Sequence, residues 1–245
     1  MSRYYYSSVR EYDKRKYPYP FYTLVREGIR LFFPKCETVW KTEKPEEPAF
    51  FVSNHTKLFA PTFFLLQKPP VRPWLNYYFL FPKACWGHLK NKVLTGKRAW
   101  LKPLGLLLTP LIVALMRGTK SIPVFHSSEK VINATFKKSV ETMESGVSQV
   151  VFPERTENRV NRYLYELNAG FPMVAEVYYR ETGKILRFYP TYCAPALKTV
   201  VVGEPIAYDP AVPMKKQRKD ICRYLENAIK ELGDGLPEHE PTVYG

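Results

Sequence analysis

The amino-acid sequence predicts an α/β fold: a mixed, largely parallel central sheet flanked by helices, preceded by an N-terminal amphipathic helical segment. Three short apolar runs, residues 50–52, 121–125 and 150–152, are typical of buried strands. Segments with helical periodicity separate them. The order strand, helix, strand, helix, strand favours parallel connections within one sheet.

The N-terminal part is the least regular. Residues 1–20 are rich in Tyr, Lys and Arg, and no apolar core of a signal peptide is visible among them. Residues 21–33 have apolar side chains at helical spacing, and such a helix either packs on its own domain or lies on a membrane interface. We therefore divide the chain into an arm and amphipathic helix, residues 1–44, and an α/β domain, residues 45–245.

The remaining elements follow from local patterns. Residues 104–116 are apolar, contain Pro110 and predict a buried helix, since the run is shorter than the roughly 18–20 residues that cross a bilayer. Residues 155–162 predict a loop. Short helices are expected at 62–67 and 163–168, strands at 173–179, 185–192 and 199–202 with a hairpin between the first two, and an amphipathic helix at 214–232.

Composition limits the function classes. The chain has 245 residues, 45% of them hydrophobic and 15% aromatic, which excludes intrinsic disorder. The 37 Lys and Arg residues outnumber 23 Asp and Glu residues, and the net charge of +14 suits an anionic partner, either a phospholipid surface or a nucleic acid. The four cysteines form no C-x-x-C pattern, so we expect no zinc site, no disulfide framework and a reducing cytosol.

Three polar residues follow predicted strands directly. His55 comes after the first strand, His126 after the second, and Glu154 after the third. The carboxyl ends of parallel strands meet at one edge of a sheet, which is where open α/β sheets bind ligands. The sequence thus predicts a site at this edge.

These residues belong to a series of short blocks. In order, the blocks are Val52-Ser53-Asn54-His55, Gly118 with Ile122-Pro123-Val124, Phe152-Pro153-Glu154, residues 169–174, residues 201–206 and the C-terminal helix. In order and separation they resemble the glycerolipid acyltransferase family, which includes the 1-acyl-sn-glycerol-3-phosphate and other lysophospholipid acyltransferases. The likeness covers residues 45–232 and implies that family's glycerol-3-phosphate acyltransferase-like α/β fold.

The resemblance also implies a reaction. A fatty acyl group would move from acyl-CoA or acyl carrier protein to a hydroxyl of a lysophospholipid or glycerophosphate acceptor, with His55 as general base. It implies a peripheral protein on the cytoplasmic face of a bacterial membrane, no metal and no bound cofactor. The substrate-binding positions that it suggests are Asn54, His126, Glu154, Arg155, Thr156 and Arg159.

The sequence departs from the family at three places. The family Asp, five positions after the His, is Ala60 here; the second-block Arg is His126; and Gly-Thr-Arg after the Glu is Arg155-Thr156-Glu157. Glu154 or a backbone carbonyl would then have to orient His55, or the reaction would run slowly on a reactive thioester. The alternative is a catalytically impaired lipid-binding relative. Nucleic-acid binding is a third reading that rests on charge and aromatics alone, and since the sequence has no RNA- or DNA-binding motif we expect no nucleic-acid partner.

Overall fold

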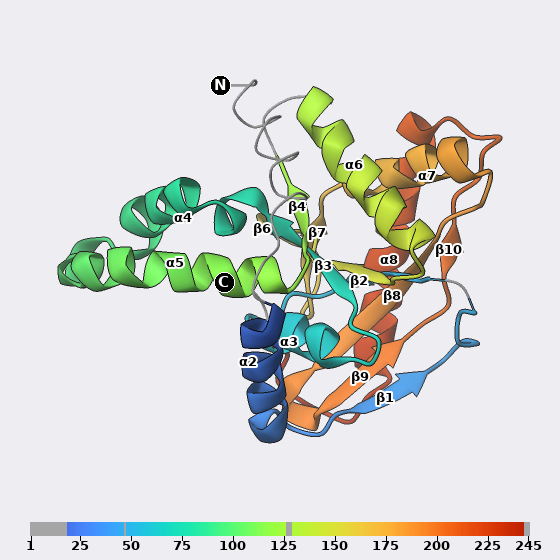
Figure 1. Ribbon diagram of the computed structural model, residues 1–245. Coiled ribbons are helices and arrows are strands. Elements are labelled where there is room, and N and C mark those ends of the chain that lie inside the picture. Colours follow the sequence, from blue (N-terminus) through green and yellow to red (C-terminus); the bar gives the residue numbers. More distant parts are fainter. Residues whose placement is uncertain (1–18, 47, 126–128, 243–245) are drawn as a thin grey trace. The chain divides into compact units, whose positions relative to one another are not determined.

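The structure is a computed structural model that describes residues 19–46, 48–125 and 129–242 (Figure 1). It forms two compact units, each assembled from two separate parts of the chain. Unit 1 combines Met1–Phe32 with Trp74–Thr135, and unit 2 combines Phe33–Pro73 with Phe136–Gly245. The division at residue 44 concerns independently folding domains and stays a prediction.

Unit 2 is built on a mixed, largely parallel sheet, which confirms the predicted fold class. Its strands are, in spatial order, β1 (Glu37–Trp40), β9 (Thr199–Val202), β8 (Arg187–Ala194), β2 (Phe50–Ser53), β5 (Gln149–Val151) and the start of β3 (Arg72–Asn76). The pairs β1 with β9, β8 with β2, β2 with β5 and β5 with β3 are parallel. Antiparallel partners of β8 are β9 and β10 (Ile206–Ala207).

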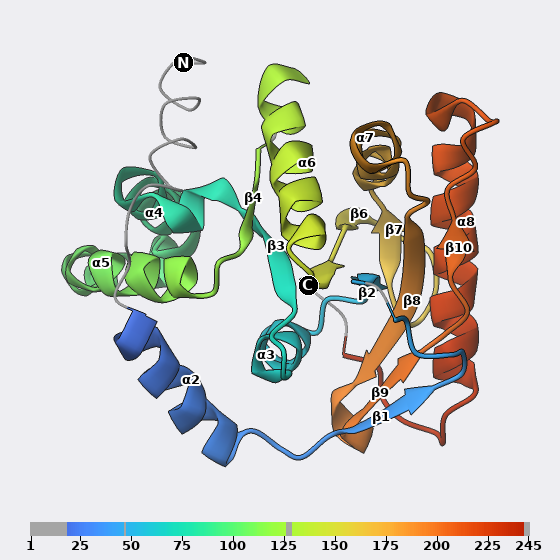
Figure 2. The same ribbon diagram turned by 45° about the vertical axis from the view of Figure 1, so that its right-hand side comes forward.

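The helices of this unit bury the faces that periodicity predicts. In Figure 2, α8 (Met214–Asp234) runs beside β8, and its residues Ile221, Leu225 and Ile229 are almost fully buried. These three residues recur every four positions, so they form one apolar stripe that the sheet covers. The other helices are α3 (Phe59–Leu66), α6 (Glu129–Glu144), which passes from unit 1 into unit 2, and α7 (Val174–Thr182).

Four local predictions in unit 2 are wrong. Residues 173–179 are mainly helix α7 rather than a strand, because Val174, Val177 and Tyr178 share one buried helical face. The expected hairpin turn is the helix end, where Gly183 takes the left-handed conformation at φ 71°.

The expected loop at 155–162 and short helix at 163–168 instead form an antiparallel pair, β6 (Glu154–Arg159) and β7 (Tyr165–Leu167). The main-chain N–H of Leu167 donates a hydrogen bond to Glu226 of α8 at 2.7 Å. This acceptor is 59 residues away in sequence, so the local pattern carries no sign of it.

Unit 1 is mainly helical. Its elements are α2 (Tyr19–Phe32), the later part of β3, η1 (Tyr77–Leu80), α4 (Pro82–His88), η2 (Leu89–Val93), η3 (Gly96–Leu101), α5 (Lys102–Gly118) and β4 (Ile122–Val124). Strand β4 runs parallel to β3, with Leu75 opposite Pro123.

Helix α5 differs from the buried helix predicted for residues 104–116. Pro110 lies inside one helix, and most of the leucines around it are exposed. Among the described residues, one helical segment, the 23-residue Gly96–Gly118, is long and apolar enough to cross a membrane if judged by length and composition alone. The run of residues 104–116 is too short for this, but the helical segment continues beyond both of its ends.

Candidate functional site

Strand register places His55 and Glu154 side by side in unit 2. Val52 of β2 is paired with Val151 of the parallel strand β5. His55 and Glu154 each follow their paired valine by three residues, so both lie beyond the carboxyl edge of the sheet. The main-chain N–H of His55 donates a hydrogen bond to Oε1 of Glu154 at 2.5 Å. Two of the three residues expected at this edge are therefore in contact, and His126 lies outside the described residues.

The Glu154 carboxylate joins two chain segments. Its Oε1 accepts from His55, and its Oε2 accepts from the main-chain N–H of Tyr165 in β7 at 2.7 Å. Burial raises the pKa of this carboxyl above its usual range, while the two N–H donors act in the opposite direction. Glu154 thus fixes the main chain of His55, which is a positioning role.

Asn54 fixes the same loop from the other side. Its side-chain amide donates to the main-chain oxygen of Cys193 in β8 at 3.1 Å, and its Oδ1 accepts from the Cys193 N–H at 2.8 Å. The Asn54 side chain is almost completely buried. This reciprocal pair mimics a backbone ladder and extends the β2–β8 pairing by one residue. Contact between Asn54 and a substrate stays a prediction.

The Cys193 thiol beside Asn54 is not a nucleophile of the site. Burial raises its pKa to about 12. Because the thiolate is the reactive form of cysteine, a thiol with this pKa is almost entirely unreactive at neutral pH.

The His55 imidazole is half-buried against an aromatic ring. The Phe152 ring packs against it in a T-shaped arrangement, with ring centroids 5.2 Å apart, and Phe152 packs in turn on Phe64. Burial lowers the pKa of His55 below its usual value of 6.5, against a smaller opposite effect of a backbone hydrogen bond. The imidazole is therefore neutral at pH 7, which is the state that accepts a proton.

Ala60, at the position of the family Asp, lies in an apolar environment. It is fully buried in a cluster whose members include Phe51, Phe63, Phe64 and Val150. Its main-chain N–H donates to Oγ1 of Thr56 at 2.9 Å, which satisfies a free donor in the first turn of α3. Sequence reasoning missed Thr56, although a Thr just before a helix is a common capping signal.

The arginines after Glu154 have different surroundings. Arg159 donates to the main-chain oxygens of Asn161 and Arg162, and Arg162 donates to the main-chain oxygen of His239. The Arg159 guanidinium group therefore binds within the β6–β7 turn, and the Arg162 group binds the C-terminal segment. Arg155 is exposed, and since it follows Glu154 in β6 the two side chains project to opposite sides of the strand. Thr156 lies in β6, and its side chain is outside the described parts.

Two further features bear on the chemistry. Within the described ranges, no group of three or more His, Cys, Asp or Glu side chains is arranged to hold a metal ion. A cavity of about 870 Å³ in unit 2 is lined by residues before β2 and at the start of β8, among them Pro48 and Arg187. These residues lie at the amino ends of the two strands, so the cavity is separate from His55.

Comparison with known proteins gives a likeness in fold. No protein-family model matches the sequence, and no curated protein matches it. Among solved structures, the chain is similar to the 1-acyl-sn-glycerophosphate (LPA) acyltransferase PlsC from Thermotoga maritima. The identity is 12%, the likeness covers 96% of this chain and 91% of that chain, and the TM-score is 0.49. Such a likeness concerns the fold alone.

Proposed function

We propose that this protein is an O-acyltransferase. It moves a fatty acyl group from acyl-CoA or acyl carrier protein to a hydroxyl of a lysophospholipid or glycerophosphate acceptor, with His55 as the general base. The observation that carries this proposal is a neutral imidazole at the carboxyl edge of the sheet, whose main chain Glu154 holds in place.

The reaction needs one group that accepts and returns a proton. As the acceptor oxygen attacks the thioester carbonyl carbon, His55 takes the hydroxyl proton. The carbon–sulfur bond of the tetrahedral intermediate then breaks, and the imidazolium gives its proton to the leaving thiolate. The products are the new ester and the free thiol, and His55 returns to its neutral form.

Orientation of the base is the unusual part of this mechanism. Glu154 acts on His55 through the main-chain N–H, and the Phe152 ring limits rotation of the imidazole on one side. Ala60 supplies no carboxylate to stabilise the imidazolium. We therefore expect a slower proton transfer than a His–Asp pair would give.

The acceptor has its own requirements. Its phosphate needs a fixed cation, and the guanidinium group of arginine is well suited to this. In residues 155–162, Arg159 and Arg162 already bind main-chain oxygens, so the exposed Arg155 is the best candidate to bind the phosphate. Asn54, His126, Glu154, Thr156 and Arg159 remain proposed substrate-binding positions. The proposal places the protein peripherally on the cytoplasmic face of a bacterial membrane, with phospholipid as its surface partner.

A second candidate is a lipid-binding relative that has lost catalysis. The burial of Ala60 among aromatic and aliphatic side chains favours it, because the space next to the helix is filled by apolar groups. In that case the site would bind a lysolipid without turning it over.

The experiment is an assay of thiol release from a panel of acyl-CoAs and acyl carrier proteins, with and without lysophosphatidic acid and other lysolipids. His55→Gln removes the base, and His88→Gln removes an imidazole from unit 1 as a matched control. Acceptor-dependent release that is lost only in His55→Gln supports the enzyme. Equal rates in all three proteins, with lysolipid binding intact, would refute catalysis and leave the lipid-binding relative.

A further inference from the structure

The second half of helix α5, in unit 1, has a buried face, but nearer its start Leu106, on the same side as Thr109 and Val113, is 54% exposed. Thr109, Val113 and Arg117 recur every four residues and are buried. The opposite stripe, at spacings of three and four residues, is exposed although it is made of leucine: Leu104 (49% exposed), Leu107 (75%), Leu108 (39%) and Leu111 (43%). We call these four residues the leucine stripe. Such a contiguous apolar face marks an interaction site rather than ordinary surface.

The residues that precede the stripe are aromatic and cationic. Trp100 is 77% exposed, and Lys90, Lys92, Lys97 and Arg98 are exposed in the segment that leads to α5. The sequence from residue 48 to residue 128 contains no Asp or Glu at all. The partner of this face is therefore apolar where it meets leucine and anionic where it meets lysine and arginine.

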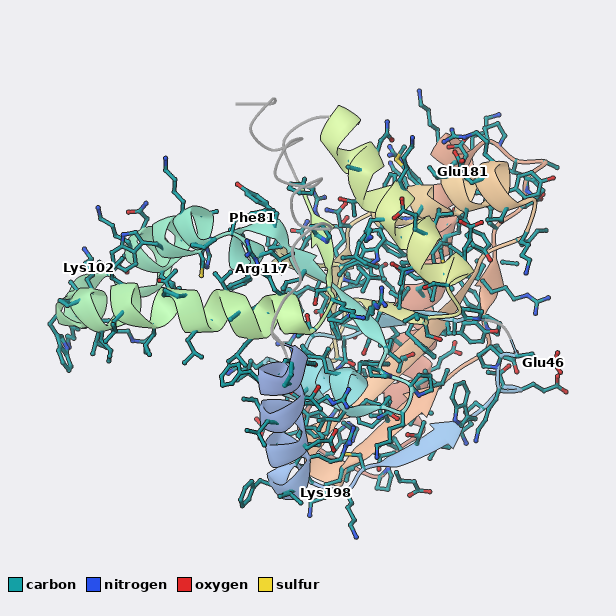
Figure 3. All side chains as sticks on the ribbon, in the orientation of Figure 1. Glu46, Phe81, Lys102, Arg117, Glu181 and Lys198 are labelled. Carbon is teal, nitrogen blue, oxygen red and sulfur yellow. The ribbon has the colours of Figure 1, made fainter. Side chains whose placement is uncertain are left out.

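The path of the chain limits how a bilayer can be met. Residues 77–121 leave β3 and return to β4, and these two strands pair with each other. A single crossing by α5 would place the two strands on opposite sides of a membrane, which their pairing forbids. Figure 3 shows Lys102 near one end of α5 and Arg117, which is buried and donates to the main-chain oxygen of Leu80, near the other. A helix lying in the interface keeps both ends at the level of the headgroups.

We propose that the leucine stripe and Trp100 insert into the surface of an anionic phospholipid bilayer, with α5 parallel to the membrane plane. The exposed lysines and Arg98 bind the lipid phosphates, and the tryptophan lies at the level of the headgroups. In the same unit, α2 has a further apolar stripe that the bilayer can receive: Phe21, Leu24, Leu31 and Phe32. Binding through this surface does not depend on the acyltransferase proposal.

A second copy of the chain is a poorer partner. Two copies meeting through α5 would bring together two segments that are basic and lack any acidic side chain. Like charges brought together at an interface oppose association. A bilayer that contains phosphatidylglycerol supplies both the apolar interior and the negative charge.

The test measures binding of the full chain to vesicles. One set contains phosphatidylglycerol and phosphatidylcholine, and the other contains phosphatidylcholine alone. Leu107→Gln with Leu111→Gln removes two leucines while keeping good helix formers. The matched control is Val160→Gln with Ile185→Gln, which changes two exposed apolar residues (46% and 48%) in unit 2.

We expect at least a ten-fold loss of vesicle partition in the leucine variant and no change in the control, because each leucine gains free energy on leaving water. Replacing Lys97 or Arg98 by Gln weakens binding to the anionic vesicles about five-fold each, and added salt does the same. Brominated lipid quenches the fluorescence of the wild type, and Trp100→Phe removes most of that quenching.

Two results would overturn the proposal. In the first, the leucine variant binds vesicles as well as the wild type does. In the second, the wild type does not bind vesicles, but sedimentation shows that it forms a dimer and that the leucine variant does not. That result would make the leucine stripe a self-association surface. Circular dichroism checks that both double variants are folded, and the quenching experiment uses the wild-type leucines, so misfolding of a variant leaves the proposal testable.

Discussion

Replacing Glu154 by glutamine tests whether this carboxylate ties the loop that carries His55 to β7. The two bonds, from the N–H groups of His55 at 2.5 Å and Tyr165 at 2.7 Å, both end on one carboxylate. Hydrogen bonds to a charged group contribute about 1.5–3 kcal/mol each. Glutamine keeps one acceptor oxygen and turns its NH₂ group toward the other N–H. One bond is therefore lost, and the desolvation that raises the pKa of Glu154 offsets part of the loss.

We expect the free energy of unfolding to fall by about 2 kcal/mol, which in a chain of this length lowers the thermal midpoint by roughly 4–8 °C. The control is Glu157→Gln, an exposed glutamate in the same strand β6. Thermal and urea unfolding of both variants are measured at pH 7. If Glu154→Gln unfolds at the same temperature as Glu157→Gln, the carboxylate does not hold the two segments together, and the positioning role is refuted.

Two more predictions concern the same loop. Asn54→Ala removes two buried hydrogen bonds to Cys193 and should lower the free energy of unfolding by about 2–3 kcal/mol in urea titrations; an unchanged midpoint would contradict the clamp. For His55, the folded-state pKa is lowered below 6.5, so the unfolded state binds more protons in the window below pH 6.5, and stability falls as the pH decreases through it. His55→Gln should therefore flatten the dependence of the thermal midpoint on pH below pH 6.5, whereas an unchanged slope would show that this imidazole is not responsible.

Much of the fold was accessible from local pattern because burial follows periodicity. Strands β2, β4 and β5 and helix α8 have apolar residues at the spacing of their element, and all four were predicted. The pattern fails for residues 173–179, where six apolar residues close together fit a strand and a helix equally well. It also fails for β6 and β7, whose pairing depends on acceptors supplied by Glu154 and by α8.

For the site, position was predictable and contact was not. Parallel register alone brings His55 and Glu154 to one edge. That Glu154 binds the main chain of His55, and that Asn54 is bound to Cys193 139 residues later, depends on three-dimensional packing. The exposed face of α5 was unpredictable for the same reason. An apolar sequence shows that a helix face is hydrophobic, but not whether the protein itself or a partner covers it.

The surroundings of Ala60 connect the site to the fold. A carboxylate at this position would lie in an apolar cluster and pay the cost of burial, unless the imidazole of His55 came close enough to share its charge. Helix α3 instead begins at Phe59, its first turn is satisfied by the Thr56 hydroxyl, which accepts from the Ala60 N–H, and alanine continues it into the core. Helix α3 is held in place by apolar packing. The main chain of His55 is held in place by the hydrogen bonds of its neighbours Asn54 and Glu154. Asn54 and Glu154 thus hold the loop without a His–Asp pair. In the proposed reaction, the absence of that pair removes the charge that would stabilise an imidazolium but leaves His55 available as the base. This arrangement predicts a reaction limited by proton transfer rather than by binding.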